Sequence, residues 1–184
     1  MQPSNRQFFQ GILFVSAILL ASTQSLAASK AEIDVRVDET LIRFKKDVGG
    51  AAAFLKSAKG VLVLPKVYKA GFGIGGEYGE GALLKNNKIV DYYSTAAASF
   101  GLQFGAQQKS IIIIFLDSKQ LDKFQKSAGW EVGVDGSVAL IELGAGGTID
   151  TNSIKDPVVA FVFGNKGLMY NLTLEGSKYT KLKK

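Results

Sequence analysis

The feature that most constrains this fold is a strict alternation of large and small residues in the middle of the chain. From Gly71 to Gly81 the odd positions carry five glycines and one glutamate, whereas the even positions include Phe72, Ile74 and Tyr78. A period of two belongs to a β-strand, whose successive side chains point to opposite faces. The stretch therefore predicts a strand with one bulky face and one nearly bare face.

Bare faces are predicted in more than one strand, so a shared reason for their glycines is expected. Glycine is unfavourable inside a strand because it loses the most backbone entropy and packs no side chain. Similar alternations surround Phe100 and follow Trp130. Two compatible explanations stay open: the bare faces allow sharp curling or a close backbone approach, or they line a groove for an acyl chain or extended ligand. In the second case the candidate ligand-facing residues are Phe72, Ile74, Phe100 and Phe104.

The same glycines satisfy the G-x-G-x-x-G pattern of dinucleotide-binding proteins, at Gly71, Gly73 and Gly76. In that motif the glycines directly follow a strand and open a helix that meets the pyrophosphate. Here Pro65–Ala70 separates the glycines from the preceding apolar run, and no helical period follows Gly76. The pattern therefore favours a strand and does not predict a nucleotide site.

The sequence lacks the residues on which most catalytic and metal sites depend. It has no cysteine and no histidine. Disulfides, thiolate metal sites, cysteine nucleophiles and histidine bases are therefore excluded. The serines have no nucleophile-elbow context. We predict no catalytic residue, no metal, no cofactor and a protein that is not an enzyme.

The first 27 residues have the features of a secretory signal peptide. Arg6 supplies a positive start, residues 11–21 are apolar, and Ser25 and Ala27 are the small residues at −3 and −1 of a cleavage site. The apolar run is about half the ~20 residues of a membrane-spanning helix. We expect cleavage after Ala27, a single domain over residues 28–184, and a periplasmic or secreted protein.

Removing Arg6 lowers the net charge from +6 to +5. Export argues against nucleic acid as a partner.

Two helical regions are predicted. Apolar residues at helical spacing predict a helix from Asp34 to Val48, followed by a short helical piece over Ala51–Lys59. Asp117 and Gln120 form a capping box for a mid-chain helix that reaches Ala128.

The other segments predict short strands. Asn86-Asn87 predicts a hairpin turn, because asparagine tolerates positive φ, and a second hairpin is expected to turn at Gly164–Gly167. The predicted fold is α+β: a mostly antiparallel, strongly curved sheet, sandwich or barrel-like, with an N-terminal helical region and one mid-chain helix.

Four blocks of the sequence resemble successive parts of the SYLF domain. They are KGVLVLPKVYKAGFGIGGEYGEGALL, YYSTAAASFGLQFGAQ, GWEVGVDGSVALIELGAGG and KDPVVAFVFGNKGLMYNLTLEGSKYTKL. The resemblance runs from about Val35 to Leu182. It implies a lipid-binding module: eukaryotic members bind phosphoinositides and in some cases actin, and bacterial members are mostly stand-alone exported proteins, which this chain resembles. Phosphoinositides are scarce in most bacteria, so the implied ligand here is an anionic lipid or membrane surface.

The resemblance also suggests where lipid is bound, because eukaryotic members are described as placing basic and apolar residues of the N-terminal helical region against the membrane. Each basic residue near an anionic surface contributes about 1 kcal/mol. The alternative is that each of these basic residues only belongs to the solvated rim of the protein and binds no lipid. A second hypothesis is a structural or interaction protein that binds another envelope protein through sheet edges or the bare faces. The candidate lipid-binding residues are Arg36, Arg43, Lys45, Lys46, Lys59, Lys66 and Lys69.

Overall fold

A computed structural model of the chain describes residues 28–142, 156–167, 174 and 176–184, and the side chains of residues 99–104, 142 and 167 lie outside this description. The expected signal peptide, residues 1–27, lies outside the described residues as well.

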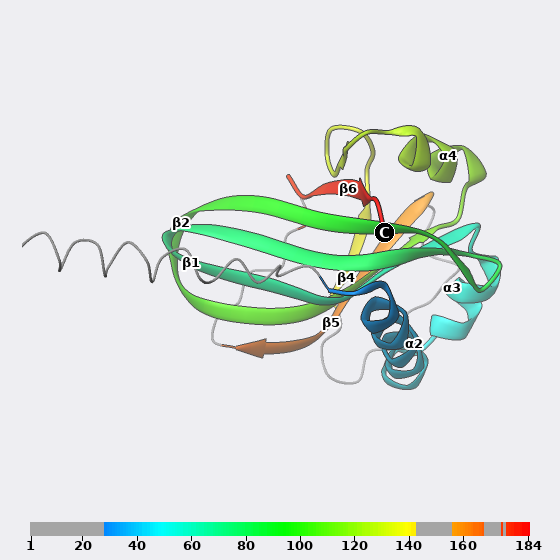
Figure 1. Cartoon of the computed structure of the whole chain (residues 1–184), viewed down its shortest axis with the longest axis horizontal. Helices are drawn as coiled ribbons and strands as arrows, with labels where there is room; N and C mark the ends of the chain where they lie inside the picture. Colours follow the sequence, from blue (N-terminus) through cyan, green and yellow to red (C-terminus); the bar gives the residue numbers. More distant parts are fainter. Residues whose placement is uncertain (1–27, 143–155, 168–173, 175) are drawn as a thin grey trace, which may run out of the picture.

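Within the described residues, a six-stranded mixed sheet forms the body of the protein and curls into half a barrel (Figure 1). Its strands follow the order β3-β6-β2-β5-β4, and β1 pairs with β2. The pairs are antiparallel except β4 with β5. The predicted fold class is therefore confirmed. The strands are β1 (Gly60–Lys85), β2 (Lys88–Phe115), β3 (Trp130–Glu131), β4 (Ala139–Glu142), β5 (Val158–Gly167) and β6 (Lys178–Leu182).

Strands β1 and β2 form one long hairpin, where the sequence predicted several shorter strands. Its turn is at Asn86 and Asn87, as predicted, with φ of 51° and 60°. The pairing extends from there to Gly60 opposite Phe115. Pro65 does not end β1, because it lies in an irregularity of the pairing between Leu64 and Val67, where the missing N–H of proline is tolerated.

The bare face of β1 allows the strand to pack against itself. A Cβ on Gly81 would lie 1.9 Å from the carbonyl oxygen of Val63, and a Cβ on Gly79 would lie 2.7 Å from that of Lys66. These are main-chain contacts that only glycine permits. Of the two explanations for the bare face, a close backbone approach is therefore confirmed for Gly79 and Gly81.

Gly73 has a different role from these two glycines. No heavy atom of the described residues beyond its chain neighbours lies within 4 Å of a Cβ placed on it, but its φ is +71°. A close backbone approach therefore does not explain the glycine at this position. The residue instead serves the sharp bend of β1, where a Cβ on Gly71 would lie 2.5 Å from the Cα of Gly75. At this bend, on the left of Figure 1, the hairpin turns back on itself.

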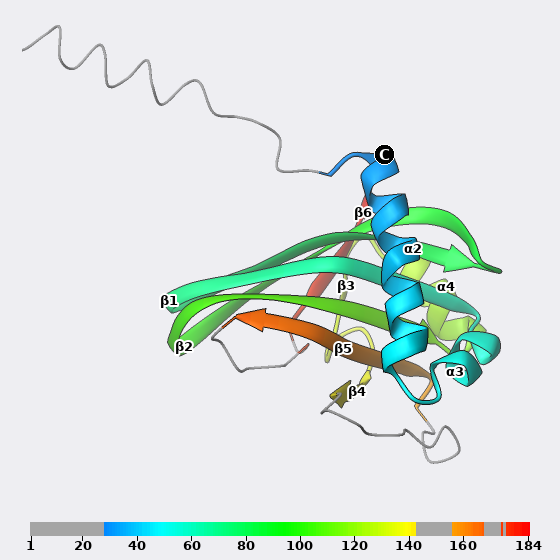
Figure 2. The ribbon, with the colours of Figure 1, turned by 90° about the horizontal axis from the view of Figure 1, so that it is seen from below.

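The helices cover opposite faces of the sheet. Helix α2 (Lys30–Asp47) crosses the strands on one face (Figure 2), and its buried apolar residues pack in one core cluster with β5 and α3 (Ala51–Ser57). Helix α4 (Ser118–Lys126) covers the other face with Leu121 and Phe124. Both N-terminal helices and α4 were expected, but α2 begins before the predicted Asp34 because Ser29 caps it, accepting a hydrogen bond from the amide of Glu32 at 3.2 Å.

The predicted hairpin turn at Gly164–Gly167 is wrong. Strand β5 continues through these residues and pairs with β2 as far as Gly167 opposite Gln107. The pairing shifts between Gln108 and Ser110, and Gly164 has φ +67° there. The glycine therefore marks a bulge within a strand rather than its end.

The cap of α4 makes a specific contribution to stability. The side chain of Asp117 accepts a hydrogen bond from the amide of Gln120 at 3.0 Å, as the capping box predicted. We expect Asp117→Ala to lower the free energy of unfolding by about 1 kcal/mol, because an amide at the helix start loses its acceptor. Urea denaturation measures this loss. Asp122→Ala, at an exposed position inside the same helix, is the control, and an equal loss in the control would contradict the capping role.

Candidate functional site

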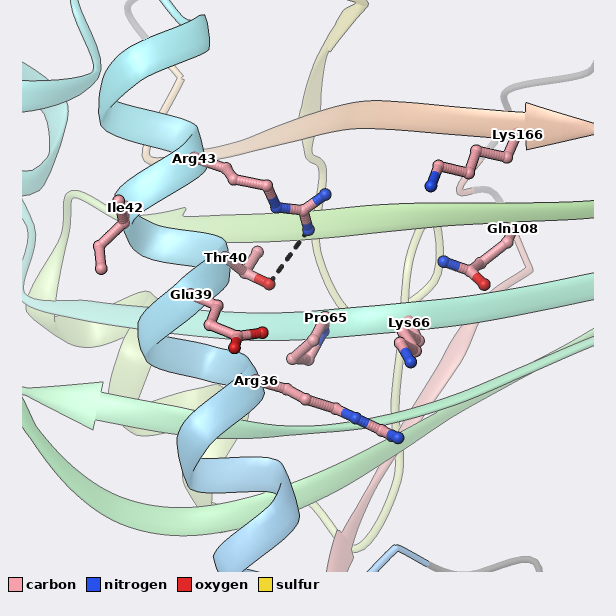
Figure 3. Close-up of a pocket in the computed structure, with 9 residues that line it drawn as sticks. All are labelled: Arg36, Glu39, Thr40, Ile42, Arg43, Pro65, Lys66, Gln108 and Lys166. Atoms are coloured by element: carbon pink, nitrogen blue, oxygen red, sulfur yellow. Dashed lines mark hydrogen bonds between the residues drawn. The ribbon is translucent and has the colours of Figure 1, made fainter.

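A cavity of about 500 Å³ lies beside α2, over the strands β1, β2 and β5. Figure 3 shows side chains from all four elements extending into the same space. Among its lining residues four are cationic, and Glu39 is the one carboxylate. The cationic residues are Arg36 and Arg43 from α2, Lys66 from β1 and Lys166 from β5. We call this cavity the cationic groove.

Arg43 is held in place by the sheet beneath it. Its Nη2 donates to Ser110 Oγ at 3.0 Å, and that hydroxyl donates to the carbonyl oxygen of Pro65 at 2.8 Å. The guanidinium also lies 5.7 Å from the ring centroid of Phe163 and 3.4 Å from Thr40 Oγ1. Because these contacts fix the side chain in advance, an anion that meets it loses little conformational entropy.

The other three cations of the groove are more exposed to solvent than a cation that is buried in an ion pair. They are Arg36, Lys66 and Lys166. Arg36 pairs with Glu32 one turn earlier on the helix, an exposed pair that contributes little to stability. Lys66 is half-buried and Lys166 is exposed. Their charges are therefore available to an anion in the groove. A guanidinium presents planar paired donors to a phosphate, and a lysine adds a mobile positive charge.

A second, more apolar cavity of about 300 Å³ adjoins the first and shares Arg36, Pro65 and Lys66 with it. Its walls include Ile33 and the rings of Tyr68 and Tyr78. We call it the apolar slot. The Tyr78 hydroxyl donates to Glu80 Oε1 at 2.7 Å. Burial, together with this carboxylate, raises the pKa of Tyr78 to about 12. A polar groove continuous with an apolar slot suits a ligand with a charged head and an apolar portion.

The inner face of the sheet carries a buried ion pair that belongs to neither cavity. Glu77 Oε2 lies 2.8 Å from Lys109 Nζ, with the two side chains 4% and 0% exposed. Glu77 Oε1 has no hydrogen-bond partner among the described residues. The pair joins distant parts of the folded-over hairpin, because Glu77 is paired in the sheet with Ala97 and Lys109 with Val67. It offers no open acid–base site.

The basic residues that were predicted to bind lipid lie at several separate places in the structure. Arg36, Arg43 and Lys66 meet in the cationic groove, while Lys45 and Lys59 line a separate cavity together with Lys56. Lys46 is exposed on α2. Lys69 is only 4% exposed and therefore lies away from the surface on which the other basic residues lie.

The predicted ligand-facing aromatic residues lie at the bend of the hairpin. Phe72 is 81% exposed and Ile74 is 68% exposed. They are paired in the sheet with Phe104 and Phe100, whose side chains lie outside the described part. The bulky face therefore points outward at Phe72 and Ile74, and the bare face points inward.

Sequence reasoning missed Lys166 and Gln108, which complete the groove. Lys166 lies in the segment that the sequence predicted to be a hairpin turn. Gln108 lies just after the alternating stretch around Phe100, where the sequence predicted a strand but no binding residue. No local signal in the sequence pairs these residues with α2.

Other kinds of site find no support in the part of the chain that the structure describes. Within those residues no three metal-ligating side chains of Asp, Glu, His or Cys gather in a group that could hold an ion. None of the helices described is long and apolar enough to cross a membrane.

The fold thus presents a groove in which cationic side chains from α2, β1 and β5 gather. The model of the Ysc84 family, described as "Las17-binding protein actin regulator", matches residues 96–184. The match lies in the C-terminal half of the chain, and the resemblance to the SYLF domain is confirmed over these residues. The family match supports a binding module. A search of curated proteins found no match.

Proposed function

We propose that this protein is an exported, non-enzymatic module that binds anionic lipid at the surface of a bacterial membrane through the cationic groove. The observation that carries the proposal is the convergence of four cationic side chains from three elements on one cavity that contains a single carboxylate among its described lining residues. The signal-peptide pattern of residues 1–27 supports a periplasmic or secreted location.

The groove suits a lipid headgroup for reasons of charge and shape. A phosphodiester carries one negative charge and acceptor oxygens, which Arg43 and Arg36 can contact as paired donors. The adjoining apolar slot offers Ile33 and two tyrosine rings to the first carbons of the lipid. The net charge of the mature chain is modest, so attraction must come from this local cluster and not from the whole surface. Its range is about 10 Å at 0.1 M salt.

The test is the binding of the mature protein to vesicles that contain phosphatidylglycerol, compared with vesicles of phosphatidylcholine alone. We expect preference for the anionic vesicles and weakening by salt. Replacing Arg36, Lys66 and Lys166 with glutamine should reduce this binding at least tenfold, because each basic residue near the surface contributes about 1 kcal/mol. Arg43 is left unchanged because it also ties α2 to the sheet.

The matched control removes the same charge from the opposite face of the sheet. Lys119, Lys123 and Lys126 all lie on α4 and are exposed, and their replacement with glutamine should leave most of the binding. Equal losses from both triple variants would mean diffuse attraction without a site. Glycerol phosphate added as a competitor separates the sources of the anion: full displacement at low concentration would mean that the groove recognises the soluble headgroup alone.

The second candidate, a structural or interaction protein that binds an envelope protein, is favoured by one observation. Phe72 and Ile74 expose large apolar side chains near each other at the bend, and exposed apolar side chains that form a contiguous patch mark interaction surfaces. If vesicle binding is indifferent to lipid charge and to the Arg36, Lys66 and Lys166 substitutions, this second function replaces the first. Native mass spectrometry of protein purified from its own envelope would then detect a bound polypeptide instead of lipid.

A further inference from the structure

The backbone at Ala28 is held by a carboxylate that comes from far along the chain. The nitrogen of Ala28 lies 3.1 Å from Glu80 Oε2. Lys184 Nζ, at the other end of the chain, lies 2.9 Å from the same oxygen and also contacts the carbonyl oxygen of Ala28. The Glu80 side chain is only 7% exposed and the Lys184 side chain 12%. Figure 2 shows the C-terminus beside the start of α2.

Ala28 is also the residue that the signal-peptide pattern places first in the mature protein. Ser25 and Ala27 are the small residues that a signal peptidase reads. Hydrolysis of the bond between Ala27 and Ala28 consumes one water. It leaves a carboxylate on Ala27 and, after protonation, an ammonium group on Ala28. A neutral amide with one N–H thus becomes a cation with three donors at the same position.

We propose that Glu80, supported by Tyr78 and Lys184, is a binding site for the newly formed amino terminus. Before cleavage the Ala28 nitrogen donates one hydrogen bond to the carboxylate. After cleavage the same contact is an ion pair, and charge-assisted hydrogen bonds are about twice as strong as neutral ones. Removal of the signal peptide therefore strengthens the contact that fixes the start of α2 to β1 and to the C-terminus.

The carboxylate has capacity for this additional charge. A carboxylate offers about four acceptor sites. Tyr78 uses one on Oε1, and Lys184 and Ala28 share Oε2. The methyl group of Ala28 also packs against the core cluster beneath α2, so the first residue is held by its nitrogen, its carbonyl oxygen and its side chain.

Cations near this site oppose the ion pair and enter the test. The nearest is Lys184, whose Nζ contacts the same Glu80 oxygen and the carbonyl oxygen of Ala28. Arg36 and Lys66 line the apolar slot together with Ala28 and Glu80. Lys30, two residues further along the chain, lies over the ring of Tyr92 at 5.6 Å from its centroid. Since these charges are the same in every variant used below, a comparison with and without Glu80 isolates the carboxylate.

The experiment compares two forms of the chain, one beginning at Ala28 and one at Leu26, each released from a fusion by a protease that leaves no extra residue. Both are made with Glu80 and with Glu80→Gln. With Glu80 present, we expect the form beginning at Ala28 to melt about 2–4 °C higher than the form beginning at Leu26, the change that a contribution of about 1 kcal/mol gives a domain of this size. With Glu80→Gln the two forms should melt together.

A second measurement keeps the proposal open to refutation if Glu80→Gln lowers stability by itself. The pH dependence of acetylation of the Ala28 amine, followed by peptide mass spectrometry, gives the pKa of that amine. It should be lower in Glu80→Gln than in the parent, because the carboxylate that stabilises the ammonium is gone. Asp122→Asn, at an exposed position on α4 and on the other face of the sheet, is the control and should leave it unchanged. An equal melting difference in both backgrounds, or a pKa unchanged by Glu80→Gln, would overturn the proposal.

Discussion

Replacing Gly81 with valine is expected to prevent stable folding of this protein. The new Cβ would lie 1.9 Å from the carbonyl oxygen of Val63 and 2.8 Å from the Cα of Leu64. Both are main-chain atoms, so no side chain can rotate away to make room. Overpacking of a core costs about 1–3 kcal/mol when side chains can yield, and we expect a loss above about 3 kcal/mol here. Circular dichroism during thermal unfolding measures it.

Gly76→Val is the control for this prediction. Gly76 lies in the same strand, without a positive φ. No heavy atom of the described residues other than its chain neighbours lies within 4 Å of a Cβ placed there. We expect at most a small change in its melting temperature. If Gly76→Val were as damaging as Gly81→Val, the cause would be general intolerance of side chains in β1 and not the close contact between its two parts.

Replacing Lys109 with methionine should be nearly as damaging, for an electrostatic reason. The substitution keeps most of the volume but leaves the Glu77 carboxylate buried without its partner. Breaking a buried ion pair by removing one member costs about 3–5 kcal/mol, whereas replacing both members with groups that pack well is often close to neutral. Chemical denaturation of the single variant should therefore show a large loss in the free energy of unfolding.

The double variant Glu77→Leu with Lys109→Met tests that reasoning. Most of the stability lost in Lys109→Met should return when the unpaired carboxylate is also removed. Losses that simply add in the double variant would show that each side chain acts by its packing alone, without coupling between the two charges.

Local chemistry explains which parts of the fold were predictable from the sequence. The Asn86-Asn87 turn and the Asp117 cap depend on residues that are neighbours in the chain, and both were predicted correctly. The continuity of β1 was missed because Pro65 normally ends a strand, and only its position in an irregular part of the pairing allows β1 to continue. The bulge at Gly164 was taken for a turn because both use glycine with positive φ.

The binding site was predicted in part. The alternation of side chains between the two faces of a strand explains why one predicted lysine lines the groove and another does not. Lys66 and Lys69 are three residues apart, so in one strand their side chains point to opposite faces. Lys66 thus lines the groove while Lys69 is buried. The inclusion of both residues among the candidate lipid-binding residues did not take this alternation into account. Lys166 joins the groove only because β5 lies beside β2 in the sheet, a long-range pairing that a single sequence does not reveal.

The contact of β1 with itself also bears on how the protein avoids association with its own copies. An exposed strand edge is a template for another strand, and proteins cover or interrupt such edges to prevent aggregation. An added strand needs a place about 4.8 Å from the edge. Along Val63–Lys66 that place is taken by Gly79 and Gly81 of the same strand. The glycines that let the hairpin fold over thereby close this edge to strand addition by a second molecule, in addition to Pro65, which offers no N–H to a new strand.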